Sequence, residues 1–168
     1  MHTFQPYPID LIEFDPFTKI GKEWMLITAS EGDKINAMTA SWGGVGVLWG
    51  KNAAFIFVRD SRYTKELIDR SDHFSLTFFD NSHKSALKYF GMVTGRREDK
   101  IKTAKMNVNY YEDIPFIDEG NFVICCRKMS ATPILPEQFL DSEIQEKWYA
   151  DGDLHTMYVG EIIQILAR

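Results

Sequence analysis

The sequence predicts a mainly antiparallel β-barrel or β-sheet with helical insertions, formed by residues 1–168 as a single domain. Strand-like segments outnumber helical ones, and the short helical patterns between them follow no regular strand–helix–strand rhythm. That lack of rhythm argues against a doubly wound parallel sheet. Hydrophobic residues make up 45% of a chain of 168 residues, which is enough to build one proper core.

An N-terminal arm and a hairpin come first. Residues 1–20 are rich in proline and aromatic residues, which favours an arm that packs over the body of the protein or over a partner subunit. Residues 24–30 and 35–41 have strand composition, and the turn residues at 31–34 predict that these two strands pair. The glycines at 43–46 predict that a glycine-rich turn follows the second strand.

The central part of the chain is expected to mix strands with short helices. Residues 53–58 form a continuous apolar run of strand formers, which predicts a buried strand. A short helix is expected at 64–69. Residues 73–79 alternate polar and apolar side chains, so a strand with one buried face is expected there. Further short helices are expected at 82–91, which ends in glycine, and at 98–106.

The C-terminal part is expected to contribute two strands and a helix. Residues 121–127 and 156–166 have strand composition, and Gly160 predicts a β-bulge in the last strand. Residues 136–148 have an amphipathic pattern with a proline in the first turn, which predicts a helix between the strands.

Charge and cysteine content limit the classes of function. The formal net charge of −5 argues against a nucleic-acid partner and against an anionic membrane surface. No apolar run approaches the roughly 20 residues that span a bilayer, and the N-terminus lacks the pattern of a secretion signal. A disulfide between the adjacent Cys125 and Cys126 would be strained. We expect one thiol to be buried and the other to lie on the opposite face, both inert, in a reduced, cytoplasmic protein.

The most informative segment is a strand of small and hydroxyl-bearing residues. It consists of Asn36, Ala37, Met38, Thr39, Ala40, Ser41 and Trp42. Its small side chains allow a flat, polar ligand to approach backbone N–H groups and hydroxyls closely. Alternation places Thr39 and Ser41 on one face and Met38 and Trp42 on the other. The same composition fits a hairpin strand that faces solvent, and the segment alone does not decide between the two.

A second segment has the composition of an anion site at the start of a helix. Its polar side chains are Arg59, Ser61, Arg62, Tyr63 and Thr64. The helix start offers free N–H groups, the guanidinium groups suit phosphate oxygens, and Ser61 or Thr64 is a candidate helix cap. An ordinary capped helix with surface arginines has the same spacing. A polar strand for a ring and a basic helix start for a phosphate together predict a phosphorylated cofactor.

Two further residues are candidates for the same site. His155 stands at the entrance to the last strand, where it fits either a ligand contact or a polar loop residue. Lys100 ends the polar segment 94–100, which fits either a cation near a ligand or a solvated helix start. We find no metal-ligand spacing, no nucleophile set and no phosphate-binding glycine motif. This pattern favours chemistry that is supplied by a cofactor.

Four segments, in this order, resemble the flavin reductase-like proteins, which have an FMN-binding split β-barrel of Greek-key type, and within them the flavoredoxin-type branch. The segments are residues 36–42, 58–64, 94–96 with 99–100, and 155–161. The resemblance spans residues 24–165. Asp60 departs from the pattern, because the commoner form of the family has proline at that position.

The resemblance implies FMN as the cofactor. Residues 36–42 would lie along the isoalloxazine ring and the ribityl chain, and His155 and Lys100 would shape the site. The phosphate would be held by Arg59, Ser61, Arg62 and Thr64. The resemblance also implies a homodimer with the flavin near the subunit interface, and an aromatic arm at 1–20 would suit such a partner.

The expected function is that of an FMN-dependent oxidoreductase, which accepts hydride from NAD(P)H and passes electrons to free flavin or another acceptor. No nicotinamide-binding signature is visible, and proteins like this need none, because the nicotinamide can stack directly on the flavin. Two alternatives stay open. One is an FMN-dependent electron carrier with a protein donor, and the other is a non-enzymatic module that binds flavin or another flat ligand such as haem.

Overall fold

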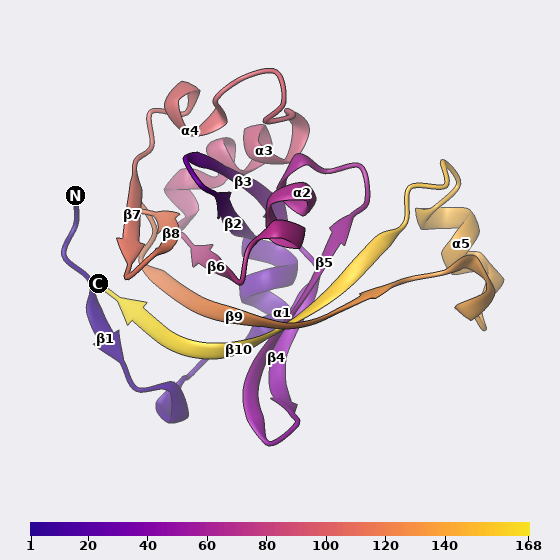
Figure 1. The fold of residues 1–168 in the computed structure, drawn as a ribbon, viewed down its shortest axis with the longest axis horizontal. Helices are drawn as coiled ribbons and strands as arrows, with labels where there is room; N and C mark the ends of the chain where they lie inside the picture. The colour runs from indigo at the N-terminus through magenta and orange to yellow at the C-terminus, as the bar shows by residue number, and fades with distance from the viewer.

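One antiparallel sheet organises the chain in the computed structural model, which describes residues 1–168 (Figure 1). The strands pair in the order β3-β2-β6-β9-β10-β5-β4, and β1 adds to β10. They are β1 (Gln5–Tyr7), β2 (Met25–Glu31), β3 (Lys34–Ala40), β4 (Gly43–Leu48), β5 (Lys51–Arg59), β6 (His73–Phe78), β9 (Phe122–Pro133) and β10 (His155–Ala167). A separate hairpin is formed by β7 (Val108–Tyr111) and β8 (Ile114–Ile117). Every pairing is antiparallel, so the predicted fold class is confirmed.

The helices are short and lie between the strands. The α-helices are α1 (Pro16–Thr18), α2 (Tyr63–Arg70), α3 (Lys84–Met92), α4 (Lys100–Thr103) and α5 (Ser142–Trp148). Single turns of other helix types are η1 (Ile9–Leu11), η2 (Lys19–Glu23), η3 (Asn81–His83) and η4 (Pro136–Gln138). Figure 1 shows α2, α3 and α4 on one side of the barrel, whereas α5 stands away from the body on the connection between β9 and β10. None of the helices combines the length and the apolar character needed to cross a membrane.

The two edges of the sheet are neighbours in sequence. β3 and β4 lie at opposite ends of the strand order, yet only Ser41 and Trp42 separate them. Because a link this short reaches only about 10 Å, the sheet must curl until its two edges come together. The result is a split β-barrel, and the split lies beside the 41–42 link.

The glycines at 43–46 do not form the expected turn, and that prediction is wrong. They begin β4, which pairs with β5. Glycine is required here because Gly43 has φ +142°, and a Cβ atom on it would lie 2.5 Å from the carbonyl oxygen of Phe55. The turn lies instead at Trp49 and Gly50, which both have positive φ as tight hairpin turns require.

The predicted hairpin, the buried strand at 53–58 and the bulge are confirmed. β2 and β3 pair with Ile27 opposite Met38. Residues 53–58 form the middle of β5. The pairing of β10 with β9 shifts register between Val159 and Gly160. A Cβ atom on this glycine would lie within 3 Å of buried side chains, so the bulge and the close packing occur at the same residue.

The strand at 73–79 was expected to bury one face, but β6 buries both. Ser75 and Thr77 are fully buried because the β7–β8 hairpin, which the sequence did not predict, covers their face. The Ser75 hydroxyl donates to the carbonyl of Pro115 at 2.6 Å, and the Thr77 hydroxyl accepts from the N–H of Ile117. These bonds allow polar side chains to face a covered surface.

Both cysteines are free and fully buried. They alternate faces as expected, since Cys126 belongs to the main core and Cys125 to a smaller cluster beneath the β7–β8 hairpin. The expectation that only one would be buried is wrong, because that hairpin covers the second face. Burial raises the pKa of the Cys125 thiol to about 12 and raises that of Cys126 as well, so both thiols are inert at neutral pH.

Several helix predictions need correction. The helix expected at 136–148 is interrupted, because the chain makes only the single turn η4 before α5, and α5 buries no residue. The helix expected at 98–106 is reduced to the four residues of α4. The helix expected at 82–91 begins as the turn η3 and ends one residue later. The cap predicted for α2 is also wrong, since Arg62 occupies the N-cap position without a side-chain bond.

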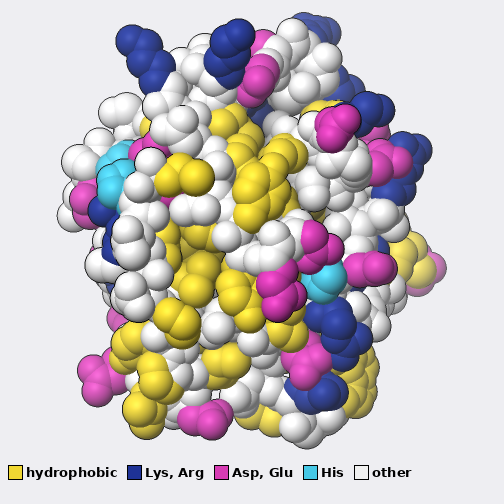
Figure 2. Space-filling view, turned by 60° about the vertical axis from the view of Figure 1, so that its left-hand side comes forward, with side chains coloured by type: hydrophobic (Ala, Val, Ile, Leu, Met, Phe, Trp, Pro, Cys, Tyr) yellow, Lys and Arg dark blue, Asp and Glu magenta, His cyan; other side chains and the backbone are white.

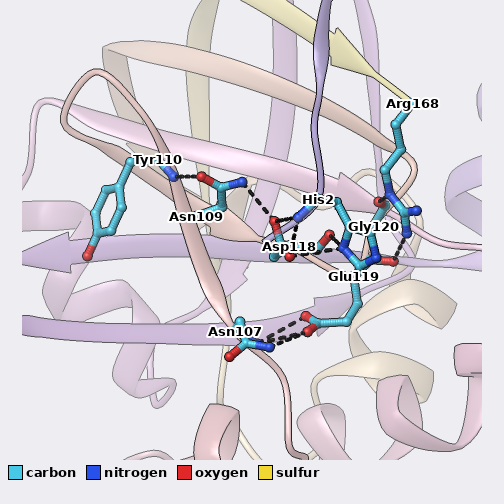
Figure 3. A network of polar contacts seen from close by, with 8 residues as sticks. All are labelled: His2, Asn107, Asn109, Tyr110, Asp118, Glu119, Gly120 and Arg168. Atoms are coloured by element: carbon cyan, nitrogen blue, oxygen red, sulfur yellow. Dashed lines mark hydrogen bonds and ion pairs between the residues drawn. The ribbon is translucent and has the colours of Figure 1, made fainter.

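The N-terminal arm packs over the body of the protein, which is one of the two arrangements that the sequence predicted. β1 pairs with β10, and aromatic residues such as Tyr7 and Phe14 pack against the main core. Figure 3 shows how the start of the arm is fastened. The main-chain N–H of His2 donates to both carboxylate oxygens of Asp118 at 3.0 and 2.9 Å, and the Asn109 side chain donates to the same carboxylate. The Arg168 side chain donates to the carbonyl of Gly120, close to Asp118 in sequence. Both ends of the chain are therefore held by the segment that directly follows β8.

Candidate functional site

A cavity of about 250 Å³, which we call cavity A, opens beside the split of the barrel. It lies where β3 ends, β5 ends and β10 begins. It is lined by Met38, Thr39, Ala40, Ser41, Trp42, Phe57, Arg59, Arg62, Gly91 and His155. No carboxylate, cysteine or lysine lines it, so its walls offer aromatic surface, small polar groups and guanidinium charge.

A second cavity of about 340 Å³, cavity B, adjoins the first and shares Arg62 with it. It lies between α2, the end of α3 and the turn that leads to α4. It is lined by Asn36, Ser61, Arg62, Tyr63, Met92, Val93, Thr94, Gly95, Arg96, Arg97 and Lys100. Four cationic side chains without a lining carboxylate make cavity B suited to an anion.

The structure brings the predicted site residues together. All of them except Ala37 and Thr64 line one of the two cavities. Ala37 is fully buried in the core beneath α3. Thr64 is also fully buried, and its hydroxyl accepts a hydrogen bond of 2.9 Å from the side chain of Asn36.

Sequence reasoning missed part of both walls. Phe57 and Gly91 in cavity A, and Met92 and Val93 in cavity B, had no assigned role, whereas Arg97 belongs to the polar segment 94–100 that was considered as a cation near a ligand. The available signals for this wall were the Thr94-Gly95-Arg96 segment of the resemblance and the charge of the polar segment 94–100. Gly91, Met92 and Val93 approach the site because α3 packs along β3, and Phe57 lines it from the end of β5.

The predicted faces of the 36–42 strand are only partly maintained. Met38 lies in the main core at 6% exposure, and the Thr39 hydroxyl donates to the carbonyl of Leu87. β3 ends at Ala40, so Ser41 and Trp42 belong to the link rather than to the strand. The ring of Trp42 lies edge-on to Trp148 with the centroids 5.0 Å apart.

The outer edge of β3 pairs with no other strand. Its backbone groups therefore face α3 and the segment 91–97 instead of a neighbouring strand. Gly95 allows a very close approach there, since a Cβ atom on it would lie 2.2 Å from the side-chain oxygen of Asn36. The free edge of β3 runs from cavity B to cavity A, because Asn36 lines the former and 38–40 the latter.

The two arginines of the predicted anion segment are held in place by carbonyl groups. Arg59 donates to the carbonyls of Asp153 at 2.6 Å and Trp148 at 3.2 Å. Arg62 donates to the carbonyls of Gly91 at 2.9 Å and Phe90 at 3.1 Å. Because carbonyls are neutral acceptors, both guanidinium charges remain available to an anion in the cavities.

Lys100 is a buried cation at the floor of cavity B. It is 2% exposed, and its Nζ donates to the carbonyl of Phe90 at 2.9 Å. Burial, reinforced by the nearby charge of Arg62, lowers the pKa of Lys100 to about 7. An anion in cavity B would supply the counter-charge that this ammonium lacks.

His155 closes one side of cavity A. It is 6% exposed, its Nδ1 lies 2.8 Å from the Tyr149 hydroxyl, and its ring centroid is 5.1 Å from that of Trp42. Burial, together with the charge of Arg59, lowers the pKa of His155 to about 4. The imidazole is therefore neutral at pH 7 and acts there as a hydrogen-bonding group.

This depressed pKa predicts how stability depends on pH. The unfolded chain binds a proton at His155 near pH 6.5 and the folded chain only near pH 4, so the folded state loses stability as pH falls between these values. The loss is expected to reach about 3 kcal/mol. Urea unfolding of the wild type and of His155→Gln at pH 7 and pH 4 measures it. A variant that loses as much stability on acidification as the wild type would contradict the assignment.

Comparison with known proteins gives the family. A family model described as the flavin reductase like domain matches residues 17–168. A comparison with curated proteins finds no match.

Solved structures share the fold. A flavoredoxin from Methanosarcina acetivorans is 24% identical with a TM-score of 0.69, over 87% of this chain and 68% of that one. An FMN-binding domain of a flavin reductases-like enzyme from Shewanella baltica is 11% identical with a TM-score of 0.69, over 98% and 77%. An NADH:FAD oxidoreductase from Streptomyces globisporus is 16% identical with a TM-score of 0.64, over 87% and 74%. The match to nearly the whole sequence and the shared split barrel lead to one conclusion: this chain belongs to the flavin reductase-like domain family.

Proposed function

We propose that this chain binds FMN along the free edge of β3 and acts as an FMN-dependent oxidoreductase, which takes hydride from NAD(P)H and passes electrons to free flavin or another acceptor. The observation that carries the proposal is that the two cavities adjoin each other at Arg62. Cavity A has aromatic walls and an open strand edge, cavity B is cationic, and Arg62 joins them. A molecule with a flat polar ring at one end and a phosphate at the other fits this arrangement.

The residues present fit FMN in kind. Residues 38–42 and Phe57 offer backbone groups and flat surface for the ring, and the ribityl chain would follow the edge of β3 towards Asn36. The phosphate is assigned to Arg59, Ser61, Arg62 and the start of α2. In this assignment Thr64 acts only through Asn36, because its own side chain is fully buried. FMN supplies the hydride- and electron-transfer chemistry when it is bound.

The chain's own residues would orient the ring and set the charge around it. Cavity A contains guanidinium charge from Arg59 and Arg62, and the neutral His155 does not add to it. Fixed positive charge at a site favours any negative charge that develops there during a reaction. Trp42 and Phe57 add aromatic surface to its walls. No side chain of cavity A is placed to act as a nucleophile.

The names of the structural neighbours support the proposal in kind. One is an FMN-binding domain, one is a flavoredoxin, and the Streptomyces protein is described as an NADH:FAD oxidoreductase. We extend NAD(P)H as the reductant to this chain on that basis. The proposal treats residues 1–168 as a single flavin-binding domain in the cytoplasm, where its two free, buried cysteines would remain reduced.

We also propose that the protein is a homodimer. Hydrophobic side chains form a band down the middle of the face that carries β1, β7 and β8 (Figure 2). Tyr110 on β7 is 52% exposed, and a contiguous exposed apolar patch often marks a protein–protein contact. Sedimentation equilibrium tests this part of the proposal, and a monomer at micromolar concentration would contradict it.

The main proposal is tested by recording the visible absorption spectrum of the bound flavin and then attempting to reduce that flavin with NADH. The purified protein is mixed with FMN, passed through a gel-filtration column, and then mixed with NADH under argon. Retained yellow flavin that bleaches would support an FMN-dependent oxidoreductase. Failure of the folded protein, verified by circular dichroism, to bind FMN at any concentration would contradict the proposal.

An electron carrier with a protein donor is the second candidate, and the segment 134–153 favours it. This segment contains the α5 excursion, and its charged residues are Glu137, Asp141, Glu143, Glu146, Lys147, Asp151 and Asp153. Its formal charge is therefore −5, equal to that of the whole chain. Leu140 and Trp148 are exposed on it, and Trp148 touches Trp42 at cavity A. Retained flavin that does not bleach with NADH would favour this candidate.

The pKa of Lys100 predicts how FMN affinity depends on pH. Only the protonated ammonium attracts a phosphate, so affinity is expected to fall as pH rises above about 7, by up to about tenfold per unit. Riboflavin lacks the phosphate and should show no such decline. Titrations between pH 7 and 9 measure both ligands, and Lys100→Met should flatten the FMN profile. Identical pH profiles for FMN and riboflavin would contradict a role for Lys100.

A further inference from the structure

Ser61 lies at the centre of the proposed phosphate segment. Both of its hydrogen-bond donors, the main-chain N–H and the hydroxyl, already have an acceptor. Its main-chain N–H donates to Oδ1 of Asp153 at 3.1 Å, and its hydroxyl donates to Oδ2 of the same carboxylate at 2.5 Å. One carboxylate thus takes both donors, in the way that two oxygens of a phosphate would.

The charge of Asp153 also acts on the two cavities. It raises the pKa of both Arg62 and His155, opposing the effect of burial at each. Arg59 donates to the main-chain carbonyl of Asp153, so the arginine and the carboxylate are neighbours. While Asp153 occupies this position, its negative charge offsets part of the positive charge that would attract a phosphate.

The Asp153 carboxylate is free to leave without unfolding its loop. Its oxygens bind only Ser61. The main chain around it is held separately, by Arg59 at the Asp153 carbonyl, by Asp151 at the Asp153 N–H, and by the Asp60 N–H at the carbonyl of Leu154. A rotation of the Asp153 side chain would therefore free both Ser61 donors and leave the backbone in place.

We infer that Asp153 is an internal competitor for the flavin phosphate and sets how strongly the site prefers phosphorylated over unphosphorylated flavin. This inference rests on the proposed function. The phosphate binds Ser61 only after the Asp153 carboxylate has turned away. The free energy of phosphate binding is therefore reduced by the cost of breaking the two hydrogen bonds between Ser61 and Asp153. A phosphate near neutral pH carries more negative charge than a carboxylate and has three acceptor oxygens, which enables it to displace Asp153.

The test compares FMN with riboflavin, since the two differ only in the phosphate. Asp153→Ala is expected to raise FMN affinity about tenfold, the effect of one charged hydrogen-bonding competitor, and to leave riboflavin affinity unchanged. Asp153→Asn keeps the shape without the charge and should give a smaller rise. Ser61→Ala should lower FMN affinity and not that of riboflavin. Asp151→Asn is the matched control, because Asp151 lies in the same loop and has no contact with Ser61.

Each outcome has a distinct meaning. A higher ratio of FMN to riboflavin affinity in Asp153→Ala, and a lower one in Ser61→Ala, would support the inference. An unchanged or lower ratio in both Asp153 variants, with the thermal midpoint preserved, would overturn it and assign the phosphate to residues of cavity B other than Ser61. If the wild type binds neither flavin, the proposed function fails. If FMN and riboflavin bind with the same affinity as each other in every variant, the inference about Asp153 is refuted and the proposed function is not.

Discussion

Replacing Arg59 and Arg62 together with alanine is expected to weaken FMN binding at least a hundredfold. Both guanidinium groups line cavity A and Arg62 also lines cavity B, so each is placed to contact the phosphate or the ring edge. A lost hydrogen bond to a charged group costs about 1.5–3 kcal/mol, and about 1.4 kcal/mol corresponds to tenfold in affinity. Quenching of flavin fluorescence measures the FMN dissociation constants of the wild type and of the double variant.

The control must separate lost charge from lost structure. Arg62 ties the end of α3 through the carbonyls of Phe90 and Gly91, so its removal also loosens a wall of both cavities. Riboflavin affinity reports that structural part, because riboflavin has no phosphate. The Arg59→Lys, Arg62→Lys variant keeps both charges and should retain more of the FMN affinity. FMN binding within twofold of the wild type in the alanine variant would remove the phosphate assignment.

Gly160→Val is expected to destabilise the fold by about 3 kcal/mol, the upper end of the usual range for overpacking a core. Gly160 lies at the bulge of β10, and a Cβ atom there would lie 2.6 Å from the ring of Phe74 and 2.8 Å from the Cβ of Cys126. Both neighbours are fully buried, so neither has free space into which it can move. Denaturant unfolding, with the midpoint and slope fitted together, measures the loss.

Gly44→Val is the matched control for this substitution. Gly44 also lies in a strand and has no positive φ, and a Cβ atom added to it would meet no other atom within 4 Å. Valine there removes the flexibility of glycine without a steric clash, and its strand propensity is high. The control should be neutral or slightly stabilising. Equal loss of stability in both variants would show that backbone freedom, and not the close contact at Gly160, is what matters.

The acidic segment 134–153 contacts residues that line cavity A. The segment that ends at Asp153 carries α5 and meets cavity A through Trp148, Tyr149 and Asp153 itself.

Local patterns were enough to predict much of this protein. The strand composition of 24–30 and 35–41 with turn residues between them predicted the β2–β3 hairpin, and the apolar run at 53–58 predicted the centre of β5. Gly160 predicted the bulge. The succession of basic, hydroxyl and aromatic residues at 59–64 placed a candidate anion segment at the start of α2. Each of these depends on residues that are near one another in the chain.

Other features depend on contacts between distant segments, and only the tertiary structure decided them. The glycines at 43–46 look like a turn, but they form the edge strand β4, whose pairing with β5 brings Gly43 so close to Phe55 that no Cβ atom fits. Ser75 and Thr77 look like an exposed face, yet the β7–β8 hairpin covers them. Pairing and covering of this kind join residues far apart in sequence, and no local pattern records them.

The candidate site shows the same division. The sequence by itself determined which residues are small, polar or cationic, and hence the kind of ligand that they suit. The tertiary structure decided that Lys100 is buried with a pKa of about 7, that Arg97 reaches cavity B, and that Asp153 holds the donors of Ser61. The physical reason is that burial, charge proximity and competition for a donor depend on distances in space, which the folded barrel sets and the order of residues does not.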